Sequence, residues 1–379
     1  MSAGRLQHLD AMRGFALAGI AFVNLTWFSG YAVMGGPERA ALPTAALDPF
    51  VRGTVHVLVD GKFYSLFALL FGVGFGLWSR RPRSHGWTRR MLVLLALGLA
   101  HASALWFGDI LSLYAVVGLL LPATRWLHSS ALLGVATTCL LMPMVLIVAQ
   151  TCGVCPNIAA DGLGPAAQLD AFAHGNYSQM LSANAGFLEM RWRLALDEGR
   201  LLKLAGMFGL GVLACRRGLV DDPHRHRATL GSIARWGLGV GLPAELAALW
   251  LGPGTPAGAM VSTVGVPTLA LGYAATAALH PPLTLAPAGR LSLSNYLLQS
   301  LVGALVFYGL GLGMWGQLGM TALVGFALVM IAVQVRLSRW WAASFGRGPV
   351  ERLWRAAAGS RPRGSAAKVR AAFPNEADP

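Results

Sequence analysis

The stretch LDAMRGFALAGIAFVN, residues 9–24, predicts a helix that enters a membrane from a charged edge. Asp10 and Arg13 lie at its start, and Asn24 follows three turns deeper. At 100° per residue, Arg13 and Asn24 return to within about 20° of the same face. Because a polar side chain is costly to bury in hydrocarbon, Asn24 is a candidate functional residue. The alternative is an asparagine that only hydrogen-bonds a neighbouring helix.

The composition around this stretch indicates a polytopic membrane protein. The chain has 379 residues, of which 55% are hydrophobic and 12% charged. A soluble domain carries roughly a quarter charged residues. The formal charge of +14 comes from basic residues in short runs between apolar segments, as in loops beside anionic lipid. No nucleic-acid motif is present, so the expected partner is the lipid bilayer and not a nucleic acid.

Apolar runs of about twenty residues can cross a bilayer as helices. The sequence contains ten of them, which predicts an all-α fold with a transmembrane bundle over residues 1–338. The predicted spans are 13–33, 54–78, 89–107, 109–126, 130–150, 199–216, 229–251, 258–279, 291–312 and 318–337.

Arginine placement predicts the orientation of these spans. With a cytoplasmic N-terminus, every cluster of bare arginines falls on the inside, and both termini lie in the cytoplasm. The expected location is therefore the inner (plasma) membrane of a bacterium, crossed many times. The inside arginines are Arg80, Arg81, Arg83, Arg89, Arg90, Arg125, Arg216, Arg217, Arg225, Arg227 and Arg290.

Three segments lie outside the predicted spans. Residues 151–196 form an outside loop. Its second half, residues 187–196, is expected to fold as an amphipathic lid helix, because Glu189 and Arg193 are four residues apart. Residues 339–358, with tryptophans among arginines, predict an interfacial segment on the cytoplasmic surface. Residues 359–379 predict a disordered tail.

The glycines and cysteines of the sequence do not indicate a nucleotide-binding loop or a structural metal site. The run FGVGFG, residues 71–76, lies inside an apolar helix with no preceding strand, which argues against a nucleotide loop. Helix packing through small residues is the better interpretation for Gly72/Gly76, Gly237/Gly241 and Gly309/Gly313. The pair Cys152 and Cys155 is a redox pair, a small disulfide loop or neither, and two cysteines are too few for a structural metal site.

His101 is the most informative single residue. It lies twelve positions from Arg89, about 18 Å into the membrane, and its side chain can exchange a proton near neutral pH. Asp109 follows eight positions later. If the helix continued to 109, the two would share a face about two turns apart, too distant for direct contact without water or another helix. The alternative role for His101 is an interhelical hydrogen bond, and His56 is the rival base.

Further polar groups lie on other spans. Asn295 and Gln299 are four residues apart, with Tyr296 beside them, and form a second polar stripe. Lys62 lies near the outer edge of the membrane, where a lysine can also simply extend its amine toward water. Glu245 lies within the seventh predicted span.

Five motifs together resemble the YeiB-like family of bacterial inner-membrane proteins, a domain of unknown function. They are residues 9–24, GKFYSLFALLFGVGFGL (61–77), GLAHASALWFGDILSLYA (98–115), GRLSLSNYLLQSL (289–301) and FGRGPVERLWR (345–355). The first motif is also similar to the membrane acyltransferase superfamily, which includes acyltransferase-three and heparan-glucosaminide acetyltransferase proteins. The acyltransferase-three pattern has a histidine where this chain has Asn24, whereas the heparan-type proteins have asparagine there.

The resemblance implies an enzyme that moves an acyl group from cytoplasmic acyl-CoA to a hydroxyl or amine of a small-molecule or glycan acceptor. His101 would be the general base or acyl carrier, oriented by Asp109, with Asn24 near the oxyanion. Arg13 would bind phosphate of the donor, and no resident cofactor is expected. The substrate-binding set is Asp10, Arg13, Lys62, Asn295, Tyr296 and Gln299. The alternative function is a small-molecule transporter or exporter. For the oligomeric state, both a monomer and an oligomer remain as alternatives.

The orientation is testable with single cysteines introduced at Gly4 and Asp170. We expect a membrane-impermeant thiol reagent to label the Asp170 variant from outside intact cells and the Gly4 variant only after lysis. Labelling of both positions from the same side would contradict the ten-span topology.

Overall fold

The computed structural model describes residues 3–80, 86–155 and 166–359, and in these ranges the regular elements are all α- or 3₁₀-helices. Five helical segments are long and apolar enough to cross a membrane: Gln7–Phe28, Asp48–Ser79, Ser129–Thr151, Pro256–Leu279 and Met320–Ser344. The all-α membrane fold predicted from the sequence therefore agrees with the structure. The count of ten spans is not confirmed.

The helices occupy the predicted apolar stretches with shifted ends. In chain order they are α1 (Ala3–Phe28), η1 (Tyr31–Val33), α2 (Gly36–Ala40), α3 (Asp48–Leu58), α4 (Lys62–Ser79), α5 (Trp87–Ala104), α6 (Leu111–Gly118), η2 (Leu121–Trp126), α7 (Ser129–Thr151), α8 (Ala166–Ala173), α9 (Tyr177–Asp197), α10 (Arg200–Arg216), α11 (Arg227–Leu251), α12 (Pro256–Leu279), η4 (Leu283–Leu285), α13 (Ala286–Arg290), α14 (Ser292–Phe307), α15 (Met320–Ser344) and α16 (Pro349–Ala357).

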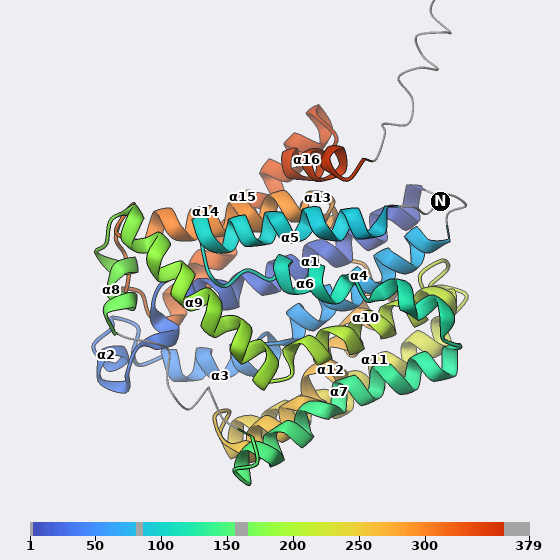
Figure 1. Cartoon of the computed structure of the whole chain (residues 1–379), viewed down its shortest axis with the longest axis horizontal. Helices are drawn as coiled ribbons and strands as arrows, with labels where there is room; N and C mark the ends of the chain where they lie inside the picture. The colour runs from blue at the N-terminus through green and yellow to red at the C-terminus, as the bar shows by residue number, and fades with distance from the viewer. Residues whose placement is uncertain (1–2, 81–85, 156–165, 360–379) are drawn as a thin grey trace, which may run out of the picture.

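The first helix runs through the middle of the bundle. Helix α1 packs against α4, α12, α13, α14 and α15 (Figure 1). Its first half contributes Leu9 and Met12 to an apolar core shared with α4, α6 and α10, and its C-terminal end contributes Phe28 to a second core shared with α9, α14 and α15. The stretch quoted first in the sequence is thus the element that joins the two cores.

Glycines set the closest helix contacts, as the small-residue pattern predicted. A Cβ atom on Gly72 would lie 2.1 Å from the Phe208 carbonyl oxygen, and one on Gly211 would lie 2.1 Å from that of Leu69. Helices α4 and α10 therefore pack backbone to backbone. In the first motif, a Cβ on Gly14 would lie 2.1 Å from the Leu285 carbonyl oxygen, so this glycine fixes α1 against the segment before α13.

Two predicted elements differ from the structure. The Gly309/Gly313 pair is not part of a helix, because α14 ends at Phe307 and the Gly309 amide donates to the Phe172 carbonyl. The second predicted span is broken between α3 and α4, where Gly61 has a φ of 77° that favours glycine. A similar break at Gly199, with a φ of 62°, separates α9 from α10.

The segment 151–196 contains two helices, α8 and α9, in its described part. Helix α9 begins at Tyr177, ten residues before the expected lid helix, and Asn176 caps it by accepting from the Gln179 amide. At the other end of the chain, α16 lies at the edge of the bundle (Figure 1), where its Trp354 indole donates to the Arg90 carbonyl at 3.1 Å. Residues 360–379, the predicted tail, lie outside the described residues.

A buried ion pair joins α4 to α11. Lys62 Nζ lies 2.5 Å from Glu245 Oε2, and both side chains are fully buried. The same amine donates to the His56 carbonyl at 2.7 Å. Each charge offsets the desolvation of the other, so removing one partner leaves an unpaired buried charge.

We expect Glu245→Gln to lower the apparent Tm strongly, because breaking a buried pair costs about 3–5 kcal/mol. The double variant Lys62→Met/Glu245→Leu should recover most of the loss, since it removes both charges. Thermal unfolding in detergent measures both. Glu189→Gln, which breaks an exposed pair with Arg193, is the control and should change little. Equal losses in the control and in Glu245→Gln would contradict a stabilising role for this pair.

Candidate functional site

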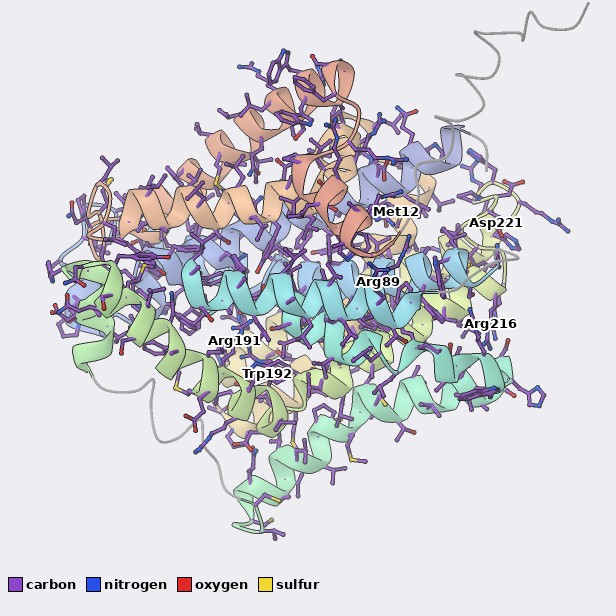
Figure 2. The ribbon with its side chains drawn as sticks, turned by 45° about the horizontal axis from the view of Figure 1, so that its top comes forward. Met12, Arg89, Arg191, Trp192, Arg216 and Asp221 are labelled. Atoms are coloured by element: carbon purple, nitrogen blue, oxygen red, sulfur yellow. The ribbon has the colours of Figure 1, made fainter. Side chains whose placement is uncertain are left out.

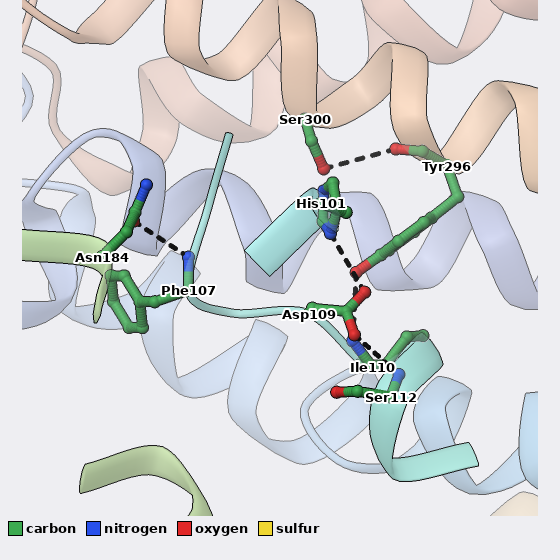
Figure 3. Close-up of polar contacts among 8 residues, drawn as sticks. All are labelled: His101, Phe107, Asp109, Ile110, Ser112, Asn184, Tyr296 and Ser300. Carbon is green, nitrogen blue, oxygen red and sulfur yellow. Dashed lines mark hydrogen bonds and ion pairs between the residues drawn. The ribbon is translucent and has the colours of Figure 1, made fainter. Parts of the chain in front are cut away.

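The chain reverses direction between α5 and α6 and brings Asp109 back onto His101. His101 Nδ1 lies 3.0 Å from Asp109 Oδ1, and the two residues are 4% and 1% exposed (Figure 3). The expectation that they are too far apart for contact is therefore wrong. It assumed that the helix continues to residue 109, whereas α5 ends at Ala104.

Local sequence explains the reversal. Asp109 Oδ2 accepts a hydrogen bond from the Ser112 amide at 2.7 Å and so satisfies a free amide in the first turn of α6. The turn packs tightly on α5 because residue 98 is glycine. A Cβ there would lie 2.5 Å from the Ser112 nitrogen and 2.7 Å from Asp109 Oδ2.

Two other helices hold the turn in place. From α14, the Tyr296 hydroxyl accepts from the Ile110 amide at 3.2 Å, and its ring centroid lies 5.2 Å from that of His101. From α9, Asn184 accepts from the Phe107 amide and donates to the Ser103 carbonyl, both at 3.1 Å (Figure 3). Sequence analysis did not identify Asn184, because nothing in its neighbourhood indicates a partner far away in the chain.

The pair has the arrangement of a base and its orienting acid. With Asp109 ionised, His101 Nδ1 carries the proton and donates it to the carboxylate, which leaves Nε2 of a neutral imidazole as a free acceptor. Nε2 is buried and has no hydrogen-bond partner in the described part of the chain. His101 can therefore take a proton from a group placed beside Nε2.

Arg191 and Tyr64 lie around the same pair and were missed by sequence analysis. Arg191 on α9 lies within electrostatic range of Tyr64, Tyr296 and Asp109, and Figure 2 shows it near the middle of the molecule. Burial and the neighbouring Arg200 lower the pKa of Arg191. Arg191 Nε and the Tyr64 hydroxyl are buried and have no partner among the described residues.

The polar stripe on α14 is mostly committed to other helices. The Asn295 amide donates to the Ala288 carbonyl at 3.0 Å and to the Ser338 hydroxyl at 2.8 Å. The Gln299 amide donates to Gln334 Oε1 at 2.9 Å. Gln299 and Gln334 also line a cavity of about 10 Å³, which has room for at most one water molecule. Only Tyr296, of the three predicted residues, contacts the site.

Asn24 and His56 each have a buried polar atom without a partner among the described residues, and neither residue is hydrogen-bonded to His101. Asn24 Nδ2 is buried without a partner among the described residues. The next turn of α1 packs Phe28 against Trp106, with ring centroids 4.4 Å apart, so α1 reaches the turn that carries Asp109. His56 Nδ1 lies 3.7 Å from Asp60, and its carbonyl accepts from Lys62 in the buried ion pair described above.

The charged start of α1 forms a separate group. Arg13 Nη1 lies 3.2 Å from Asp10 Oδ1, and the Arg13 side chain is 35% exposed. Other basic residues nearby have protein partners, because Arg80 pairs with Asp221 at 2.7 Å and Arg216 donates to the Leu127 carbonyl at 2.8 Å. Figure 2 shows Arg216 and Asp221 together near one end of the molecule. Within the described part of the chain, Arg13 is thus held only by the acid on its own helix.

Among the described residues, no group of three or more His, Cys, Asp or Glu side chains could hold a metal ion. Cys152 and Cys155 are both free thiols.

Comparison with known proteins gives relatives over nearly the whole length. Residues 214–361 match the family described as "Protein of unknown function (DUF418)". The chain is 28% identical to "Uncharacterized protein YxaH" of Bacillus subtilis, over 93% of this chain and 94% of the relative. It is 29% identical to "Uncharacterized protein YeiB" of Escherichia coli, over 92% and 94%. No solved structure matches the chain. The resemblance to the YeiB-like proteins is therefore confirmed, and the link to acyltransferases is not shown.

We expect Asn184→Ala to loosen the turn that carries Asp109, because the Phe107 amide and the Ser103 carbonyl lose their partner. Hydrogen–deuterium exchange should show faster uptake in peptides covering residues 103–110. Ser182→Ala, an exposed change on the same helix, is the control and should leave this uptake unchanged. Wild-type protection in Asn184→Ala would mean that α9 does not hold the turn.

Proposed function

Starting from the YeiB-like resemblance, we propose that this protein is a membrane-embedded acyltransferase that uses His101 as general base. The observation that carries the proposal is the buried His101–Asp109 pair, whose Nε2 has no partner among the described residues. A scaffold histidine would normally satisfy both ring nitrogens, because a buried polar atom left unpaired costs about 1–3 kcal/mol.

The donor is acyl-CoA, which approaches from the cytoplasm at the start of α1. Arg13 is partly exposed there, and Asp10 is its one ion-pair partner among the described residues, so its remaining guanidinium donors can bind phosphate. The proposal includes ten membrane spans, both termini in the cytoplasm and a location in the bacterial inner membrane.

The transfer needs no group beyond the two substrates and the chain. The acceptor hydroxyl or amine gives its proton to His101 Nε2 while its oxygen or nitrogen bonds to the acyl carbon. The carbon–sulfur bond of the thioester then breaks, and the CoA thiolate takes the proton from His101 Nε2. Asp109 stabilises the imidazolium between these steps. Asn24 Nδ2, which is free to donate, is the candidate donor to the oxyanion.

We expect His101→Gln to keep the fold and lower acyl transfer by about 10²–10⁴-fold, because glutamine retains a hydrogen bond to Asp109 but cannot accept the proton. Asp109→Asn should give a smaller loss, since it disturbs only the orientation of His101. Release of CoA thiol from acetyl-CoA by purified protein, with a library of hydroxyl and amine acceptors, measures both. Wild-type turnover in His101→Gln together with an inactive His56→Gln would place the base on α3 instead.

A transporter or exporter is the second candidate, and one observation favours it. Asp60, beside His56 and Lys62, lies within electrostatic range of Arg200, which in turn acts on Tyr64 and Arg191. Polar groups therefore extend from the Lys62–Glu245 pair toward His101, as in a path through a carrier. Consumption of acyl-CoA without a membrane gradient separates the two functions, because a carrier has no reason to break a thioester.

A further inference from the structure

Arg191 is a half-buried cation that has no protein partner among the described residues. It makes no hydrogen bond or ion pair within the described part of the chain, and its Nε is fully buried. An arginine in such a place normally has a carboxylate beside it, because a buried charge is costly unless it is paired. On the same helix, Arg193 shows the ordinary arrangement, since it is exposed and lies 2.6 Å from Glu189.

The neighbours of Arg191 cannot supply the missing acceptor. The Asp109 carboxylate acts on the charge of Arg191, but both of its oxygens are already bonded, to His101 and to the Ser112 amide. The charge that acts on Arg191 most strongly is that of a second guanidinium, Arg200, which pairs with Glu198 at 2.5 Å. Two guanidinium groups within electrostatic range repel each other, and an oxyanion beside them relieves the repulsion.

Two further buried polar atoms also lack hydrogen-bond partners among the described residues. The Tyr64 hydroxyl on α4 lies within electrostatic range of both Arg191 and Asp109, and it is buried and unbonded. His101 Nε2 on α5 is the other. Asp109 connects the three groups, because it contacts His101 at 3.0 Å and lies within electrostatic range of both Arg191 and Tyr64.

We infer that Arg191 and Tyr64 bind an oxyanion, a carboxylate or a phosphate, that belongs to the acyl acceptor, so that the acceptor hydroxyl or amine reaches His101 Nε2. The inference rests on the proposed function in assigning the oxyanion to the acceptor. The binding itself is independent of acyl transfer. An Arg guanidinium and a hydroxyl donor, neither of which has a protein partner among the described residues, form a donor set that suits carboxylates and phosphates.

The test is thermal unfolding of the full-length protein in phosphatidylcholine nanodiscs, in buffer free of phosphate and carboxylate. The probes are glycerol 3-phosphate and lactate, with glycerol as the uncharged match for the first. We expect at least one anion to raise the apparent Tm in a saturable way and glycerol to have no effect. Nanodiscs that contain phosphatidylglycerol form the lipid arm, in which stabilisation without any soluble probe identifies the phosphate as a lipid headgroup.

The variants assign the binding to this site. In Arg191→Gln the ligand-free Tm should rise, because an unpaired buried charge is removed, and the apparent Kd for the anion should weaken at least tenfold. Arg193→Gln, two residues away on the opposite face, should leave both values unchanged. His101→Gln should still be stabilised by the anion while transfer is lost, so a failure of the acyltransferase proposal and a failure of this inference give different results.

Two outcomes overturn the inference. One is a wild-type protein that neither soluble anion nor anionic lipid stabilises. The other is equal stabilisation of the wild type and Arg191→Gln. Should Arg191→Gln fail to accumulate, Tyr64→Phe decides instead, because it removes one hydroxyl and no charge. We expect that variant to bind the anion about tenfold more weakly, and unchanged binding would overturn the inference.

Discussion

The chain reversal between α5 and α6 is the constraint on which the rest of the site depends. It places the Asp109 carboxylate in the interior, where an unpaired charge is costly and every oxygen needs a donor. His101 and the Ser112 amide supply these donors, and Gly98 gives the space that lets them meet. Helices α9 and α14 then hold the turn from either side. A change in any of these elements would leave a buried carboxylate without its partner.

The sequence predicted those features of the fold that follow from local pattern. Apolar runs located the helices, and glycine spacing located the contact between α4 and α10, where Gly72 and Gly211 meet backbone atoms of the opposite helix. The Gly309/Gly313 pair shows the limit of that rule. The same spacing is found there in a loop, because spacing alone does not show that the backbone is helical. The breaks at Gly61 and Gly199 depend on a positive φ, which a hydrophobicity pattern does not record.

For the site, residue type was more informative than spacing. His101 and Asp109 were identifiable because titratable side chains are rare within apolar segments, yet their direct contact required the end of α5 at Ala104. Sequence analysis missed Arg191, because the spacing of Glu189 and Arg193 predicts a helix with a solvent-exposed charged face. Its position two residues from each places it on the opposite face. On that face, Asn184 bonds α9 to the turn that carries Asp109, which a charge pattern does not record.

Hydrogen-bond satisfaction separates the polar residues that hold the bundle together from those that can act on a substrate. Asn295 and the Lys62 amine have protein partners at close distance, so they stabilise helix contacts and have little capacity left for a ligand. His101 Nε2, the Tyr64 hydroxyl and Arg191 Nε are equally buried but unpaired. Each unpaired atom lowers the stability of the ligand-free fold by about 1–3 kcal/mol. A bound molecule with complementary polar groups removes that cost, so the same interior both tolerates the empty state and favours a polar, charged ligand over an apolar one.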